Sequence, residues 1–123
     1  MTAVRRTIAV VDDDAGIRAA LADLLHAADF DARVFGSAEE FLERGLGERI
    51  DCLVTDIHLP GMTGIALLRE LGVRGKAIPA VLVTGRHDPA TLELIRRAES
   101  VPCLRKPFSD SELFDAMQRV MDA

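Results

Sequence analysis

Four short, mostly apolar runs in this chain each end at polar residues. The runs cover residues 8–11, 52–55, 80–83 and 101–105, and the polar residues that follow them are Asp12, Asp13, Asp56, Thr84 and Lys106. A further run at residues 32–35 and intervening segments with helical periodicity complete the pattern, which favours a doubly wound α/β fold with a parallel five-stranded sheet. Because the carboxyl ends of parallel strands share one edge of a sheet, the polar side chains are predicted to meet there.

Three of the predicted helices begin with a capping signature. The candidate caps are Asp13 or Asp14, the pair Ser37 and Glu40, and the pair Ser109 and Glu112. Apolar residues spaced by three or four positions follow, which is typical of amphipathic helices. The first stripe comprises Ile17, Ala20, Leu21, Leu24, Leu25 and Ala28, and the last comprises Leu113, Phe114, Met117, Val120 and Met121.

Two further helices are predicted from shorter patterns. Ile65, Leu68 and Leu71 mark a third helix after the turn-rich residues 60–64. Asp88 followed by proline is a cap with proline at the first helical position, which opens a fourth helix. Its apolar stripe is the thinnest of all, and consists of Leu92, Ile95 and Ala98. We therefore expect this helix to move most readily.

The composition fits a single folded domain over residues 1–123, with no separate output domain. Of the 123 residues, 49% are hydrophobic and 28% charged, which argues against a disordered chain. The formal net charge is −5 and the basic residues are scattered, so binding of nucleic acid or of a membrane by this domain is not expected. Two cysteines and no signal-peptide pattern favour a reducing compartment, and we expect the cytoplasm.

The converging carboxylates indicate a divalent metal. Two or three carboxylates that lie close together repel one another, and Mg²⁺ relieves this repulsion with carboxylate, water and phosphate oxygens as ligands. We expect Asp13 and Asp56 to bind the ion directly and Asp12 to lie nearby, through water. The backbone carbonyl of His58 is predicted to complete the ligand set.

The same edge suits phosphoryl transfer. A carboxylate at a strand end, here Asp56, can attack phosphorus and become an aspartyl phosphate. Lys106 would neutralise charge on the phosphoryl oxygens, and Thr84 would donate its hydroxyl hydrogen to the same group. A simpler interpretation holds for neighbouring residues: Asp14 is a helix cap, the ring of His58 is solvated, and Cys52 is inert core.

The motifs resemble those of the receiver domain of bacterial two-component response regulators. The matching segments are residues 11–14 (VDDD), 55–64 (TDIHLPGMTG), 83–85 (VTG) and 105–108 (RKPF), in family order along the whole chain. The resemblance implies a flavodoxin-like sheet with strand order 2-1-3-4-5. It also implies phosphorylation of Asp56 by a histidine kinase or a histidine phosphotransfer protein, and a role for side chains at His58 and Arg86 in setting the lifetime of the phosphoryl group.

Two features depart from the family pattern. An aromatic residue usually stands three positions before the lysine, where the chain has Cys103, and the segment 97–102 replaces the usual Ala-Gly-rich connection. We therefore expect Thr84 and the loop 85–88 to carry the signal to the fourth helix. The surface of the fourth helix, fifth strand and fifth helix is the expected output surface and a candidate dimer surface.

Two other functions remain open at this point. Residues 12–14 and Lys106 also resemble motifs of haloacid dehalogenase-type phosphohydrolases, but Gly16 stands where that family has Thr or Val, and Asp56 would have no role. A receiver relative that binds a partner without phosphorylation should have lost site residues, whereas this chain has the complete set.

The implied strand order also separates Cys52 from Cys103, so no disulfide is expected between them.

Overall fold

The computed structural model describes residues 5–98 and 100–122, in which strands and helices alternate as predicted. The strands are β1 (Thr7–Val11), β2 (Asp31–Phe35), β3 (Cys52–Asp56), β4 (Ala80–Thr84) and β5 (Cys103–Arg105). The helices are α1 (Ala15–Ala27), α2 (Ala38–Arg44), α3 (Gly64–Val73), α4 (Pro89–Arg97) and α5 (Asp110–Met121). None of the described helices combines the length and the apolar character needed to cross a membrane.

The strands form one parallel sheet with the order β2-β1-β3-β4-β5. This is the flavodoxin-like order implied by the family resemblance, and the prediction is confirmed. Strand β4 separates Cys52 on β3 from Cys103 on β5, and both thiols are free. Burial raises the pKa of the Cys52 thiol to about 12, so it remains protonated in the core.

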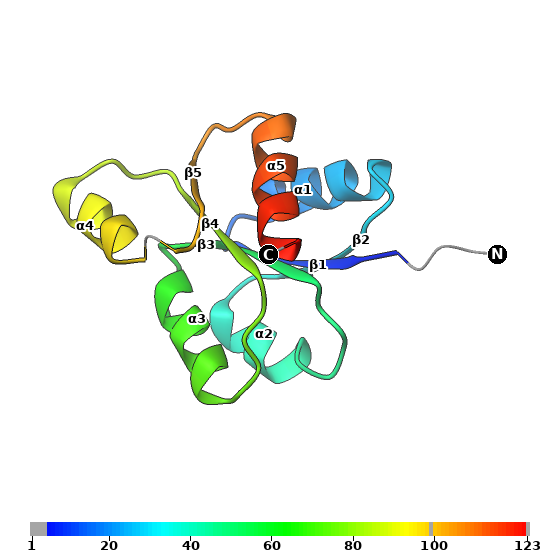
Figure 1. Cartoon of the computed structure of the whole chain (residues 1–123), viewed down its shortest axis with the longest axis horizontal. Helices are drawn as coiled ribbons and strands as arrows, with labels where there is room; N and C mark the ends of the chain where they lie inside the picture. The colour runs from blue at the N-terminus through cyan, green and yellow to red at the C-terminus, as the bar shows by residue number, and fades with distance from the viewer. Residues whose placement is uncertain (1–4, 99, 123) are drawn as a thin grey trace.

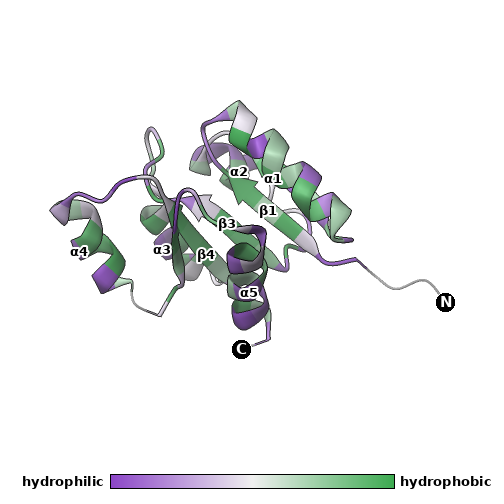
Figure 2. Cartoon of the chain, turned by 90° about the horizontal axis from the view of Figure 1, so that it is seen from above, coloured by the Kyte–Doolittle hydropathy of each residue, from purple (hydrophilic) through white to green (hydrophobic). Residues whose placement is uncertain are grey.

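Two apolar layers cover the two faces of the sheet, with α1 and α5 on one face and α2 and α3 on the other (Figure 1). Alternate residues of β1 serve different layers: Ile8 and Val10 pack with α1 and α5, whereas Ala9 and Val11 pack with α2 and α3. The central strands are accordingly apolar along most of their length (Figure 2). Strands buried on both faces are expected in a parallel sheet covered by helices.

Four predicted helix caps are present, at Asp14, Ser37, Asp88 and Ser109, but the one at Ser37 differs in detail. Asp14 caps α1 by accepting hydrogen bonds from the amides of Gly16 and Ile17. The Ser109 and Glu112 pair forms the complete capping box of α5. The prediction of a full box at Ser37 was wrong, because Glu40 accepts from the Gly36 amide and so fixes the loop before the cap.

The buried faces of three helices differ from the predicted stripes. In α3, Leu67 and Leu71 are buried while Leu68 is only half-buried. In α4, Thr91 is fully buried and Leu92 is 40% exposed, so the predicted stripe was wrong there. In α1, Leu21 and Leu25 are buried but the predicted Ala20 and Ala28 are exposed. Helix rotation depends on contacts with the sheet, which spacing alone does not reveal.

Helix α3 begins against the end of β3, and Gly64 allows this close approach. The Gly64 amide donates to the Ile57 carbonyl over 3.0 Å. A Cβ atom at position 64 would lie 2.1 Å from the carbonyl oxygen of Asp56. The missing side chain therefore lets α3 pack on the loop that carries Asp56.

We predict that Gly64→Ala lowers the free energy of unfolding by about 1–3 kcal/mol, because backbone must shift to accept the methyl group. The matched control is Gly72→Ala in the same helix, where nothing lies within 4 Å of the new Cβ. That change should raise the free energy of unfolding by up to about 1 kcal/mol through helix propensity. Denaturant titrations measure both values, and equal values for the two variants would contradict the prediction.

Candidate functional site

The ammonium group of Lys106 joins two strands at the carboxyl edge of the sheet. Its Nζ donates to Asp12 Oδ2 over 2.9 Å and to Asp56 Oδ2 over 2.8 Å. The main chain of Lys106 is also held there, because its amide donates to the Thr84 carbonyl over 2.8 Å. The ends of β1, β3 and β4 and the start of the loop after β5 thus meet at a single cation.

Burial and charge act in opposite directions on this lysine. Desolvation lowers the pKa of Lys106, but the hydrogen bonds and negative charges of Asp56 and Asp12 outweigh it, and the pKa is raised above the ordinary lysine value. The ammonium form is therefore retained at neutral pH. Asp12 and Asp56 are themselves buried, with side chains 2% and 9% exposed, so water screens these ion pairs only weakly.

Three carboxylates lie together as the sequence predicted. One oxygen from each of Asp12, Asp13 and Asp56 falls within 4.8 Å of the others. Lys106 compensates only one of their three charges. Asp13 is exposed and its carboxylate accepts no hydrogen bond within the described part of the chain, so its oxygens are available as ligands. The donor set, oxygen atoms with an uncompensated negative charge, fits Mg²⁺.

The loop after β1 has a support that the sequence analysis missed. Arg18 in α1 donates from Nη1 to the Asp12 carbonyl over 2.7 Å, and the Asp14 amide donates to Asp12 Oδ1 over 2.9 Å. These contacts fix Asp12 and leave Asp13 facing solvent. The only available signal was the position of Arg18, which lies one helical turn after the cap at Asp14.

Thr84 lies at the predicted edge and is fully buried. It follows Val83, which is opposite Asp56 in the register of β4 and β3. The Thr84 hydroxyl oxygen accepts a hydrogen bond from the Arg86 amide over 3.1 Å. Its hydroxyl hydrogen therefore remains available to an acceptor at the edge of the sheet, while its oxygen holds the loop that leads to α4.

His58 makes two contacts that its position in the sequence did not reveal. Its amide donates to Asp56 Oδ1 over 2.9 Å, and its ring atom Nε2 lies 2.9 Å from the hydroxyl of Thr91 in α4. The interpretation of the ring as a solvated loop group was wrong. The ring is directed to the start of α4, and the backbone carbonyl remains the predicted metal ligand.

Cys103 takes the place of an aromatic ring and is half-buried in β5. Burial raises the pKa of its thiol more than Arg105 lowers it, so the group is a neutral thiol at neutral pH. It lies beside Pro102 and Ala116 in a shallow hollow that also includes the polar residues Glu112, Asp115 and Arg119. The Cys103 side chain is therefore much smaller than the usual aromatic ring, and its movement would displace little volume.

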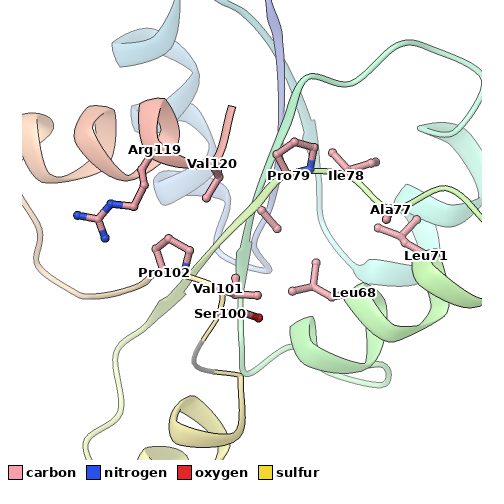
Figure 3. A pocket seen from close by; sticks show the side chains of 11 residues that line it. Leu68, Leu71, Ala77, Ile78, Pro79, Ser100, Val101, Pro102, Arg119 and Val120 are labelled. Atoms are coloured by element: carbon pink, nitrogen blue, oxygen red, sulfur yellow. The ribbon is translucent and has the colours of Figure 1, made fainter. Parts of the chain in front are cut away.

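A separate groove of about 370 Å³ lies at the opposite, amino-terminal edge of the sheet (Figure 3). Apolar side chains from α3, the start of β4 and the segment before β5 line it, including Leu68, Ile78 and Val101. Among its lining residues in the described part of the chain, Arg119 is the one ionisable group. The described lining offers no cluster of titratable groups like the one at the carboxyl edge, which remains the candidate site.

Comparison with protein families gives a match over almost the whole chain. Residues 8–118 match the model of the response regulator receiver domain. The transcriptional regulatory protein FixJ of Rhizobium meliloti is 36% identical over 117 residues, which cover 94% of this chain and 57% of FixJ. Nodulation protein W of Bradyrhizobium diazoefficiens is 37% identical over 109 residues, which cover 88% of this chain and 48% of that protein. The chain thus spans about half the length of these relatives.

Solved structures agree with the family match. The crystal structure of FixJ-N has a TM-score of 0.85 and 33% sequence identity, and covers 98% of this chain and 96% of that one. The response regulator StyR has a TM-score of 0.85 and 35% identity, with 97% and 60% of the two chains covered. The chemotaxis protein CheY4 of Vibrio cholerae, at 23% identity, shares the fold, with a TM-score of 0.83 over 95% and 99% of the chains.

We predict that Lys106→Met lowers the free energy of unfolding at pH 7 without Mg²⁺. Loss of the cation leaves Asp12 and Asp56 facing each other, and because Lys106 is 21% exposed the effect is about 1–3 kcal/mol rather than that of a fully buried pair. A raised pKa means that the stabilisation is complete below the ordinary lysine pKa of 10.5 and is lost only at more alkaline pH. Added Mg²⁺ should restore more stability to the variant than to the wild type.

Thermal melts with and without Mg²⁺ make this measurement. Lys76→Met is the matched control, because Lys76 is exposed and lies at the opposite edge of the sheet after α3. The same loss of charge there should change stability little. Equal destabilisation of the two variants would contradict a structural role for the Lys106 ammonium.

Proposed function

Since this chain belongs to the response regulator receiver domain family, we propose that Asp56 accepts its phosphoryl group from a histidine kinase or a histidine phosphotransfer protein. The observation that carries the assignment is the paired contact of Lys106 with Asp12 and Asp56. This contact sets Asp56 apart from Asp13, which Lys106 does not contact, and the position of Asp56 at the end of the central strand β3 with 7% exposure sets it apart from Asp12, which is 1% exposed. Asp12 also lies deeper, with a main-chain carbonyl held by Arg18.

The transfer needs one nucleophile and groups that neutralise charge. An oxygen of the Asp56 carboxylate attacks phosphorus, and a new oxygen–phosphorus bond forms as the phosphorus–nitrogen bond of the donor phosphohistidine breaks. The electron pair of that bond stays on the imidazole nitrogen, which takes up a proton. The Lys106 ammonium pairs with the phosphoryl oxygens, and the Thr84 hydroxyl donates a hydrogen bond to them.

Asp13 and Asp56, with Asp12 nearby and the His58 carbonyl, would hold Mg²⁺. When bound, the ion neutralises negative charge on the carboxylates and on phosphoryl oxygens, which would otherwise repel each other. The close approach of Asp12, Asp13 and Asp56 supports this assignment, because a single lysine does not balance their charge.

We further propose that the domain takes part in its own dephosphorylation, in which water attacks the phosphorus of the aspartyl phosphate. The side chains of His58 and Arg86 lie next to the candidate site, and both line a hollow with Asp13. They are therefore placed to control the access of water. The domain acts as a signalling receiver in the cytoplasm rather than as a metabolic enzyme.

The output surface is proposed to be that of α4, β5 and α5, which also serves as a dimer surface. The connection is Thr84, because its hydroxyl oxygen holds the Arg86 amide and thereby the loop before α4. Movement of Thr84 toward the phosphoryl group would release that contact. The matched residues cover only 57% of FixJ of Rhizobium meliloti, a transcriptional regulatory protein, so we propose that the signal passes from this domain to a further output domain or partner.

The two alternative functions are less well supported. A haloacid dehalogenase-type phosphohydrolase would use Asp12 as the nucleophile, but Asp12 is only 1% exposed, against 7% for Asp56, and Asp56 would then have no role. A receiver relative without phosphorylation would not require the acidic cluster and the lysine. Repulsion among the carboxylates and desolvation of the buried charges both lower stability.

We predict that Asp56→Asn abolishes phosphorylation by a small phosphodonor in the presence of Mg²⁺. The amide is a far weaker nucleophile than the carboxylate. Intact-mass measurement should show the addition of one phosphoryl group to the wild type and none to the variant. Full labelling of Asp56→Asn would move the nucleophile to another carboxylate and would favour the phosphohydrolase alternative.

We predict that Asp13→Asn weakens Mg²⁺ binding and slows phosphorylation together, each by about tenfold or more, because one anionic ligand is lost. The matched control is Asp14→Asn, which makes the same change at the next residue. Asn caps a helix as well as Asp does, so that variant should bind and react like the wild type. Calorimetric titration and the labelling rate measure the two effects, and an unchanged Mg²⁺ affinity in Asp13→Asn would contradict the ligand assignment.

A further inference from the structure

Helix α4 is held to the rest of the domain by unusually few apolar contacts. Thr91 is its one buried residue, and Leu92 and Leu94 are 40% and 36% exposed. Neither of the two apolar clusters that cover the sheet includes a residue of this helix, all of which lies in the described part of the chain. Figure 1 shows α4 at the edge of the molecule, away from the other helices. Directional polar contacts therefore matter more for its position than for that of any other helix.

The buried hydroxyl of Thr91 lies in a chain of hydrogen bonds. Its Oγ1 donates to Asp88 Oδ1 over 2.7 Å. The ring atom Nε2 of His58 lies 2.9 Å from Thr91 Oγ1. The Thr91 hydrogen bond lowers the pKa of Asp88, which is therefore a carboxylate and only accepts. Because the single hydroxyl hydrogen goes to Asp88, Thr91 can only accept from His58. The direction of the chain is thus fixed: His58 Nε2–H donates to Thr91, and Thr91 donates to Asp88.

Both ends of this chain are structurally important. Asp88 is the N-cap of α4, and it also accepts from the Thr91 amide over 3.3 Å. His58 is joined through its own amide to Asp56 Oδ1 over 2.9 Å. One residue, His58, therefore contacts the phosphoacceptor with its main chain and the first turn of α4 with its ring.

We propose that the hydrogen-bond chain from His58 through Thr91 to Asp88 couples the state of Asp56 to the position of α4. It holds α4 in the unphosphorylated arrangement, and it transmits movement of the Asp56 loop when the bonding of the Asp56 oxygens changes. This inference rests on the proposed phosphorylation of Asp56. It assigns to three polar residues, in addition to Thr84, the coupling that Cys103 lacks the volume to provide.

The first test uses the unphosphorylated protein, so its result does not depend on phosphorylation. Thr91→Val keeps the shape of the side chain but removes the hydroxyl, whereas Thr91→Ser keeps the hydroxyl and loses a methyl group. Amide hydrogen exchange in residues 89–97 should be about fivefold faster or more in Thr91→Val, and close to wild type in Thr91→Ser. Exchange in α5 should be unchanged in both. Equal α4 exchange in wild type and Thr91→Val would overturn the proposal.

His58→Ala tests the same chain from its other end and covers the case in which Thr91→Val does not fold. It should also speed exchange in α4, and the double variant should exchange little faster than Thr91→Val alone, because loss of the Thr91 hydroxyl already removes the contact with His58. Additive effects of the two changes would show that His58 and Thr91 act separately, and would overturn the coupling.

The last test concerns the response to phosphorylation. On treatment with Mg²⁺ and a small phosphodonor, amide chemical shifts of α4 should change in the wild type and in Thr91→Ser. In unphosphorylated Thr91→Val they should already lie part of the way toward the phosphorylated values. If the wild type is labelled at Asp56 and Thr91→Val responds as the wild type does, the coupling is wrong while the proposed function stands. If the wild type is not labelled at all, the proposed function itself fails.

Discussion

The position of the whole carboxyl edge depends on one ammonium group between two buried carboxylates. Lys106 contacts Asp12 after β1 and Asp56 at the end of β3, and its amide is bonded to Thr84 at the end of β4. Three carboxylates within 4.8 Å would repel one another and would favour separation of these strand ends. The lysine removes part of that repulsion but not all of it. The remaining negative charge is a cost to stability, which is consistent with selection for cation and phosphoryl binding rather than for stability alone.

The features that the sequence predicted well are those determined by neighbouring residues. Apolar runs with polar residues at their ends predicted the strands, and the caps at Asp14, Asp88 and Ser109 predicted where helices start. Strand order came from family resemblance, since nothing in the period of a strand tells which strand lies beside it. The rotation of α3 was missed because the close approach of Gly64 to the Asp56 carbonyl, and not the spacing of leucines, brings Leu67 to the core.

In the candidate site, too, the features set by neighbouring residues were predicted and those set by tertiary contacts were not. Asp12, Asp13, Asp56, Thr84 and Lys106 were found because each lies at or just after the end of a strand, and parallel strands end at a common edge. The contacts of Arg18 and the pairing of His58 with Thr91 could not be predicted in this way. They join residues whose proximity depends on how a helix and a loop are placed on the sheet. The sequence contained one indirect indication of the role of Thr91. It is a polar residue in the first turn of a helix whose apolar stripe is too thin to hold that helix on the sheet by itself.

The absence of an aromatic ring in β5 changes the physical basis of signal transmission. A ring transmits a change by filling or leaving a volume, which requires a movement of several ångströms and an apolar pocket to receive it. A hydrogen bond depends on distance and angle, and is lost when donor and acceptor separate beyond about 3.5 Å. A displacement of less than about 1 Å at His58 is therefore enough to break its bond with Thr91, which now spans 2.9 Å. Because Thr91 is the one buried residue of α4, little apolar packing opposes that small change, and under the proposed coupling it reaches the whole helix.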